Sequence, residues 1–238
     1  MLFFYVRHGD PIYHPDSLTP LGQEQARLLA KRFVSYGLDR IYASDSVRAM
    51  MTAQPTAELL KKEIISCPWA NEHLAGKDFF FDRGTPQGRW AFQKQSFIEK
   101  FNSAEVIAMG KEWYRHPDFS EYTFERGLKR INEAVDELFL ELGFVHDREN
   151  NCFVKVKDAP QRVALFAHQG FGMLFMSSVL DIPYPLYSTR FDISHSCMNV
   201  IHFDETQELI YPRVLQVSND AHLYRDGLMA GYQNLYHF

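Results

Sequence analysis

The residues of this chain that could do chemistry are two histidines, two arginines and one glutamate. Arg7 and His8 follow an apolar run at the N-terminus, His168 follows a second apolar run, and Arg48 and Glu72 each come shortly after another. Arginine presents planar, paired donors that fit phosphate oxygens, and a neutral histidine nitrogen is a competent nucleophile. Because a nearby carboxyl group can protonate a leaving oxygen, the set suits phosphoryl transfer, which depends mostly on positioning and electrostatic stabilisation.

Short apolar runs separated by helical patterns must position these side chains. The runs predict strands, and the predicted strands cover residues 2–6, 40–43, 64–67, 162–167, 197–203 and 209–217. Thr19-Pro20 is typical of a helix start, with Thr19 as the N-cap, and Ser44-Asp45-Ser46 offers caps for the next helix. We expect Pro55 to break or kink that helix. A long helix with one apolar face should end at Gly143.

The alternation of strands and helices predicts an α/β fold. We expect a three-layer sandwich with a mostly parallel central sheet, formed by one domain over residues 1–238. The pattern weakens over residues 77–120, which we interpret as a helical or irregular cap insert. In open sheets of this kind ligands bind beyond the carboxyl ends of the strands, where the five side chains are expected to meet.

Composition and charge exclude several classes of protein. The chain has 238 residues, 46% of them hydrophobic and 15% aromatic, which is too apolar for a disordered protein. The formal net charge of -5 argues against nucleic acid as a partner. It also predicts weak attraction for anions, unless positive charge is gathered locally.

The cysteines and the N-terminus bear on the compartment. Three cysteines, Cys67, Cys152 and Cys197, cannot form a fully paired set of disulfides, which indicates a reducing environment. Residues 1–6 are apolar but too few for the core of a signal peptide, and no run reaches the roughly 20 apolar residues of a membrane span. We therefore expect a cytoplasmic protein with no membrane partner.

Several ordered motifs resemble those of the histidine phosphatase superfamily, also called phosphoglycerate mutase-like, in its branch 1. Arg7-His8-Gly9 matches the family's RHG signature, and residues 18–26 resemble its LTxxGxxQA helix start. Residues 41–49, with Thr52-Ala53, resemble its SxLxRAxxTA segment. Residues 163–168 match the strand that delivers a second histidine. The RHG motif alone would be weak evidence of a resemblance, whereas the four motifs in this order are specific to the family.

The resemblance implies a role for each residue. His8 would be the nucleophile that forms a phosphohistidine, and Arg7, Arg48 and His168 would bind and stabilise the phosphoryl group. Glu72 falls where the proton donor is expected, and would act as general acid and then as general base toward water. The adjacent guanidinium charges should help to keep His8 neutral. The reaction implied is the metal-independent hydrolysis of a small phosphorylated metabolite, without a cofactor.

Two other functions remain open at this point. The first is a cofactor-dependent mutase of the phosphoglycerate mutase type, although the longer motifs of those enzymes around the acid are missing. The second is a non-catalytic module that binds a phosphate ligand or a protein, which the presence of all five expected groups disfavours. Late strands of such folds can pair between protomers, so a homodimer is also left open.

Some residues have competing interpretations. Glu63, Asp78 and Glu105 compete with Glu72 as the acid. His168 is followed by Gln169, and not by the Asp that supplies the acid in the phytase and acid phosphatase branch, which favours Glu72. His195 lies in Ser194-His195-Ser196. It is more simply explained as a hydrogen-bonded structural histidine than as a residue that supports the site residues.

The insert is rich in aromatic residues. Between residues 79 and 119 there are ten: Phe79, Phe80, Phe81, Trp90, Phe92, Phe97, Phe101, Trp113, Tyr114 and Phe119. The simpler interpretation is a small core belonging to the cap. The alternative is an aromatic lid that favours bulky or apolar phosphomonoesters, whereas Lys77, Arg83 and Arg89 could instead favour acidic substrates.

Overall fold

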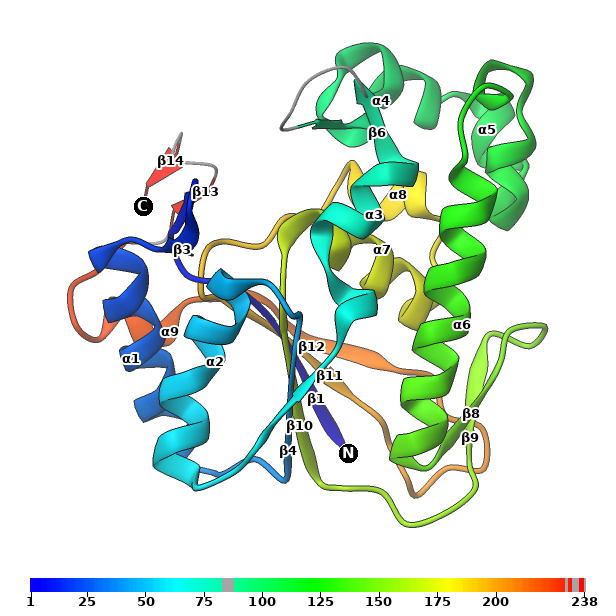
Figure 1. Ribbon diagram of the computed structural model, residues 1–238. Coiled ribbons are helices and arrows are strands. Elements are labelled where there is room, and N and C mark those ends of the chain that lie inside the picture. The colour runs from blue at the N-terminus through cyan, green and yellow to red at the C-terminus, as the bar shows by residue number, and fades with distance from the viewer. Residues whose placement is uncertain (83–87, 230, 233–235, 238) are drawn as a thin grey trace.

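The computed structural model describes residues 1–82, 88–229, 231–232 and 236–237. Its centre is a six-stranded sheet in the order β12-β11-β1-β10-β4-β5 (Figure 1). Its strands are β1 (Leu2–Arg7), β4 (Arg40–Ala43), β5 (Ile64–Ser66), β10 (Arg162–Ala167), β11 (Met198–His202) and β12 (Arg213–Asn219). The pairs β1–β10, β10–β4 and β4–β5 are parallel, whereas β11 runs antiparallel to both of its neighbours. The prediction of an α/β fold with a mostly parallel sheet is confirmed.

Helices cover both faces of the sheet. The α-helices are α1 (Pro20–Val34), α2 (Val47–Leu60), α3 (Glu72–Phe79), α4 (Gln95–Phe101), α5 (Ala104–Ala108), α6 (Phe124–Leu142), α7 (Gln169–Leu180), α8 (Tyr184–Ser188) and α9 (Ala221–Tyr224). Alternate residues of β1 point to opposite faces. Phe4 packs with Phe33 of α1, whereas Phe3 packs with Phe139 of α6 and Phe175 of α7. The three layers follow directly from this alternation.

Short strand pairs and 3₁₀ turns complete the described chain. The pairs are β2 (Pro11–Tyr13) with β3 (Asp16–Leu18), β6 (Phe80–Asp82) with β7 (Arg89–Trp90), β8 (Phe144–Asp147) with β9 (Cys152–Lys155), and β13 (Gly231–Tyr232) with β14 (Tyr236–His237). The 3₁₀ turns are η1 (Pro68–Ala70), η2 (Ala91–Gln93), η3 (Gly110–Arg115) and η4 (Pro117–Phe119). None of the described helices is long and apolar enough to cross a membrane.

The helix boundaries mostly agree with the sequence. Thr19 caps α1 by accepting from the Gly22 N–H, Ser46 caps α2, and α6 ends at Gly143, whose φ is +106°. Pro55 was expected to break or kink this helix; a break is wrong, because α2 is a single helix over residues 47–60, and the kink stays a prediction. Pro55 lacks the N–H that would bond four residues back. The buried face of the helix, which includes Ala53 and Ala57, nevertheless packs into the core and holds the helix together.

The last strand is also shorter than predicted. It was expected over residues 209–217, and β12 begins only at Arg213. Pro212 has no N–H to donate to a ladder. Ile210, before it, instead forms an isolated antiparallel bridge with Phe153.

Most aromatic residues of the insert lie in a core. Seven of the ten side chains are buried: Phe79, Trp90, Phe92, Phe97, Phe101, Trp113 and Phe119. Trp113 contacts Phe101, Phe124 of α6 and Tyr184 of α8, so this cluster joins the insert to the rest of the molecule. Arg83 lies outside the described residues. Assignment of residues 77–120 as a cap within a single domain stays a prediction.

Two glycines bring the first loop against α1. A side-chain carbon at Gly22 would lie 2.2 Å from the carbonyl oxygen of Asp10, and one at Gly9 would lie 2.6 Å from the carbonyl oxygen of Gly22. Both obstacles are backbone atoms, which cannot turn aside. We therefore expect Gly22→Ala to lower the free energy of unfolding by about 1–3 kcal/mol, as overpacking does.

Urea denaturation of the Gly22→Ala variant checks this prediction. Glu24→Ala, which removes an exposed ion pair with Arg27 on the same helix, should leave the stability close to that of the wild type, because water and salt screen such a pair. Helix propensity alone predicts the opposite sign for Gly22→Ala, a gain of up to about 1 kcal/mol. Such a gain would show that the two backbones do not pack closely here.

Candidate active site

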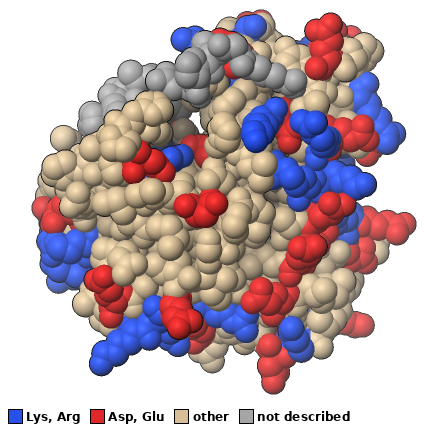
Figure 2. All heavy atoms as spheres, viewed as in Figure 1, with Lys and Arg blue, Asp and Glu red and all other residues tan. Residues whose placement is uncertain are grey.

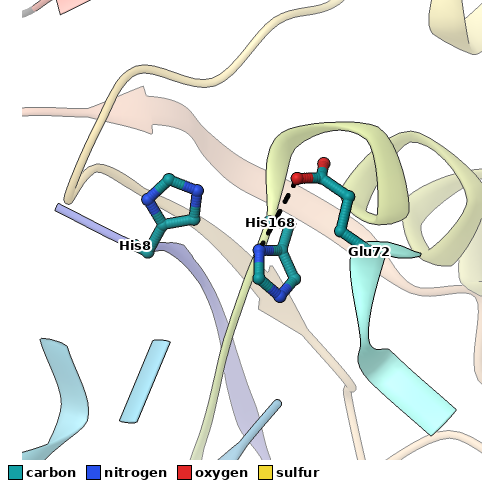
Figure 3. A group of neighbouring side chains, drawn as sticks. All are labelled: His8, Glu72 and His168. Atoms are coloured by element: carbon teal, nitrogen blue, oxygen red, sulfur yellow. Dashed lines mark ion pairs between the residues drawn. The ribbon is translucent and has the colours of Figure 1, made fainter. Parts of the chain in front are cut away.

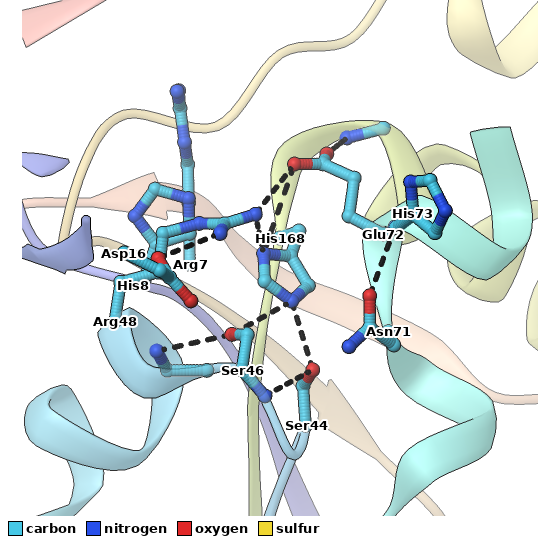
Figure 4. A network of polar contacts seen from close by, with 12 residues as sticks. Arg7, His8, Asp16, Ser44, Ser46, Arg48, Asn71, Glu72, His73 and His168 are labelled. Carbon is cyan, nitrogen blue, oxygen red and sulfur yellow. Dashed lines mark hydrogen bonds and ion pairs between the residues drawn. The ribbon is translucent and has the colours of Figure 1, made fainter. Parts of the chain in front are cut away.

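The five predicted residues converge at the carboxyl edge of three adjacent strands. Arg7 ends β1, His168 directly follows β10, and Arg48 lies in the first turn of α2, just beyond β4. Figure 4 shows the five side chains near one another, with Arg48, Glu72 and His168 joined by polar contacts. Glu72 is the first residue of α3. The cap of this helix is Asn71, whose side chain also donates to Asp45 in the loop before α2.

His8 is buried, with a defined tautomer. Its Nδ1 lies 2.7 Å from the carbonyl oxygen of Gly9. A carbonyl oxygen only accepts hydrogen bonds, so Nδ1 carries the proton and Nε2 keeps its lone pair. Burial holds the pKa of His8 well below its usual range, and the neighbouring guanidinium charges of Arg48 and Arg7 lower it further. His8 is therefore a neutral imidazole with a free Nε2.

Arg7 is held by groups on the loop before β11. Its Nη1 donates to the Ile193 carbonyl oxygen at 2.7 Å, and its Nη2 donates to Nε2 of His195 at 2.7 Å. Its Nε is buried and has no partner among the described residues. An unsatisfied buried donor on a guanidinium is costly unless an anion accepts from it.

Arg48 is held by side chains alone. Its Nη1 donates to Oδ1 of Asp16 at 2.9 Å, and its Nη2 donates to Nδ1 of His168 at 3.0 Å and to Oε2 of Glu72 at 3.2 Å. Its Nε, like that of Arg7, is buried without a described partner. The guanidinium groups of Arg7 and Arg48 therefore each have one N–H, on Nε, that can donate to a ligand.

His168 has the opposite tautomer to His8. Since the Arg48 guanidinium can only donate, Nδ1 of His168 accepts, and the proton is on Nε2. That N–H donates to Oγ of Ser44 at 2.9 Å, with Oγ of Ser46 at 3.3 Å. Burial lowers the pKa of His168 well below its usual range, and the charge of Arg48 lowers it further. The hydroxyl of Tyr5 fixes the backbone by donating to the His168 carbonyl oxygen at 2.5 Å.

Glu72 projects toward both histidines from the start of α3 (Figure 3). Its Oε1 accepts from the Gly170 N–H at 2.9 Å, and its Oε2 lies 3.7 Å from Nδ1 of His168. The competing acids lie elsewhere. Asp78 is buried in ion pairs with Arg126 and Arg130 of α6.

The remaining candidates for the acid and for a thiol nucleophile do not join the site network. Glu105 is exposed and pairs with Lys100, and Glu63 is exposed at the end of the loop after α2. Cys197 lies beside β1, where burial raises the pKa of its thiol to about 12. A thiolate nucleophile is therefore disfavoured.

His8, Glu72 and His168 could in principle hold a metal ion. One ligand atom from each lies within 4.8 Å of the others, and this donor set is one that zinc uses. However, Nδ1 of His168 and Oε2 of Glu72 already accept from the Arg48 guanidinium. A fixed positive charge at that position repels a cation and attracts an anion. The donor chemistry therefore favours a phosphate-like ligand.

Several residues of the network were not assigned to the site from the sequence. Ser44 and Ser46 were expected only as helix caps, and they also contact His168. Thr52 accepts from the Gly9 N–H and donates to the Arg48 carbonyl oxygen, so it ties two motifs together. Position within the family segment was the only available signal for Thr52. His195, interpreted from the sequence as structural, is bonded to Arg7.

The buried neutral histidines predict that stability falls in mild acid. Burial is the first cause that lowers the pKa of His8, His168, His195 and His222, to about 2 for His195 and about 3 for His222. Unfolded histidine binds protons below a pH of about 6.5, and these folded ones do not, so stability is lost as the pH falls through that value. Each should contribute a slope of about 1.4 kcal/mol per pH unit below it.

Urea denaturation between pH 7.5 and 5 measures this slope. His222→Gln should reduce it by the share of one histidine, while His73→Ala, which removes an exposed histidine, should leave it unchanged. A free energy of unfolding that stays constant from pH 7.5 to 5.5 would contradict the neutral, buried state of these side chains.

Comparison with known proteins agrees with this geometry. Residues 4–78 match the model of the histidine phosphatase superfamily (branch 1), and this segment contains His8, Arg48 and Glu72. The similarity to this superfamily covers residues 4–78 of the chain. No curated protein matches the sequence significantly.

Solved structures share the histidine phosphatase fold over nearly the whole chain. A mycobacterial glucosyl-3-phosphoglycerate phosphatase in complex with VO3 is 18% identical, with a TM-score of 0.60 and coverage of 92% of this chain and 99% of the other. A phosphoserine phosphatase from Entamoeba histolytica is 18% identical, with a TM-score of 0.59 and coverage of 93% and 98%. An alpha-ribazole phosphatase from Shigella flexneri is 17% identical, with a TM-score of 0.58 and coverage of 92% and 96%.

Proposed function

We propose that this protein is a metal-independent phosphomonoester hydrolase that acts through a phosphohistidine on a small phosphorylated metabolite. One observation carries the proposal. A neutral His8, with its proton on Nδ1 and a free Nε2, lies in a site where the buried Nε atoms of Arg7 and Arg48 have no described partner. A phosphoryl group satisfies all three, because it offers an electrophilic phosphorus and several anionic oxygens.

The proposed reaction has two steps. In the first, Nε2 of His8 attacks phosphorus, the bond to the leaving oxygen breaks, and that oxygen takes a proton from the carboxyl group of Glu72. In the second, the Glu72 carboxylate removes a proton from water, and the oxygen of that water attacks phosphorus. The N–P bond then breaks and returns its electron pair to His8. Arg7 and Arg48 stabilise the charge on the oxygens that remain on phosphorus.

The positions of the two arginines also explain how a protein with a net negative charge could bind an anionic substrate. Figure 2 shows basic and acidic side chains interspersed over the visible face. The positive charge that would bind phosphate lies inside the site, on Arg7, which is 3% exposed, and on Arg48. A field of this size suits a small phosphoester better than a polyanion. The similar solved structures include enzymes named for glucosyl-3-phosphoglycerate, phosphoserine and alpha-ribazole phosphate substrates, which supports a small phosphorylated metabolite.

A panel of phosphomonoesters tests the proposal. The purified protein should release phosphate from at least one sugar, amino-acid or aryl phosphate in the presence of EDTA. An alkaline quench during turnover of a labelled substrate should trap one phosphoryl group on a histidine, recognised because phosphohistidine is stable to base and labile to acid. Absence of phosphatase activity over the panel, or activity that EDTA abolishes, would overturn it. Sugar phosphates turned over as well as aryl phosphates would exclude the aromatic lid.

A further inference from the structure

A small hairpin reaches the site from outside the main sheet. Strands β2 and β3 pair only with each other, and β3 packs against α1 and α2. The hairpin carries Asp16 at the start of β3 and Tyr13 at the end of β2. Both side chains contact Arg48, and the motifs that identify the family assign no role to either.

Asp16 divides its two oxygens between the backbone and the guanidinium of α2. Its Oδ2 accepts from the N–H of Val47, the first residue of the helix, at 2.9 Å. Its Oδ1 accepts from Nη1 of Arg48 at 2.9 Å. The ring of Tyr13 lies against the same guanidinium, with 5.4 Å between the ring centre and Cζ of Arg48, a distance typical of a cation–π contact. One carboxylate therefore sets both the start of the helix and the orientation of its second side chain.

The two arginines of the site differ in what holds them. Arg7 donates to the backbone carbonyl of Ile193, which cannot move away. Arg48 donates, among the described residues, only to the side chains of Asp16, Glu72 and His168. Glu72 and His168 are the groups that the proposed reaction uses, so Asp16 is the partner that can stay in place during turnover.

We propose that Asp16 is a positioning residue that holds Arg48 for the phosphoryl group and prevents its complete capture by Glu72. The proposal rests on the phosphatase function above. With Nη1 anchored on Asp16, Nη2 faces Glu72 and His168 and Nε stays free. Without the anchor, the guanidinium can turn and pair fully with Glu72. A carboxylate in such a pair is a poorer proton donor to a leaving oxygen.

Asp16→Asn tests this role. Asn has a donor NH2 in place of one of the two oxygens that accept from Val47 and Arg48, so one of these two hydrogen bonds is lost in the observed geometry. We expect kcat for an alkyl phosphate to fall about 10- to 100-fold, the scale of a misplaced catalytic group. The kcat for p-nitrophenyl phosphate should fall less than about 10-fold, because its leaving oxygen needs little protonation. KM should change less than about threefold, since Arg7, which Asp16 does not contact, still binds the phosphate.

Two further variants separate positioning from simple destabilisation. Asp16→Glu keeps the carboxylate and should recover most of the lost kcat. Ser17→Ala removes a hydroxyl of the same hairpin that donates only to the carbonyl oxygen of Pro15, and should match the wild type. Equal losses of kcat on both substrates, or no loss in Asp16→Asn, would overturn the inference. An inactive wild type would instead contradict the phosphatase function itself.

Discussion

His8→Ala is expected to lower kcat by at least about 10³-fold, the loss typical when a covalent nucleophile is removed. The structure gives His8 a protonated Nδ1 bonded to Gly9 and a free Nε2, and burial keeps the ring neutral. No other described histidine of the site has a free nitrogen in this position. His168 uses Nε2 on Ser44 and Nδ1 on Arg48, and His195 uses Nε2 on Arg7. A second nucleophile should therefore not replace it.

The measurement pairs steady-state hydrolysis with trapping by an alkaline quench, in which phosphohistidine is stable. Wild-type protein should carry trapped label during turnover, and His8→Ala should carry none. His73→Ala serves as the matched control, because this exposed histidine is the neighbour of Glu72 and its ring makes no described contact with the site network. Phosphatase activity or trapped label that survives in His8→Ala would refute the phosphohistidine mechanism.

Glu72→Gln is expected to produce a loss that depends on the leaving group. The glutamine keeps an oxygen for the Gly170 N–H but cannot give a proton to the leaving oxygen. General acid catalysis contributes about 10²- to 10⁴-fold, so kcat for an alkyl phosphate should fall by that amount. p-Nitrophenolate leaves without protonation at neutral pH, and its ester should lose less than about tenfold in the first step.

Single-turnover rates with the two esters isolate that first step. Glu105→Gln is the matched control, since Glu105 is an exposed carboxylate paired with Lys100 on the insert, and it should behave as the wild type does. An equal loss on alkyl and aryl esters would mean that Glu72 only orients Arg48. Full activity in Glu72→Gln would show that Glu72 is not the general acid and that another group donates the proton.

The sequence by itself determined the fold class and most of the strands, and it named five candidate site residues that the structure brings together. Local chemistry was sufficient for this. Short apolar runs such as residues 162–167 are typical of buried strands, and Thr19-Pro20 is typical of a helix start. Parallel strands bring their carboxyl ends to one edge, so Arg7 and His168 had to become neighbours once β1 and β10 paired.

Where local rules failed, tertiary contacts outweighed them. Pro55 does not interrupt α2, because the buried face of that helix is held by the core. Glu72 occupies the first turn of α3, where Asn71 and Asp45 fix the entry to the helix. Neither the packing of α2 in the core nor the bond between Asn71 and Asp45 can be predicted from the periodicity of the sequence. Each contact joins segments that meet only in the folded chain.

The tertiary structure alone decided the states of the site groups. The tautomers of His8 and His168 depend on whether a carbonyl or a guanidinium faces Nδ1, and the sequence does not contain that information. The anchoring of Arg48 by Asp16, 32 residues earlier, depends on how a hairpin outside the sheet packs on α2. The sequence therefore determined which chemical groups are present. Burial and hydrogen-bond direction, which arise only from packing, determined which nitrogen is free, which is protonated and which guanidinium donors remain for a ligand.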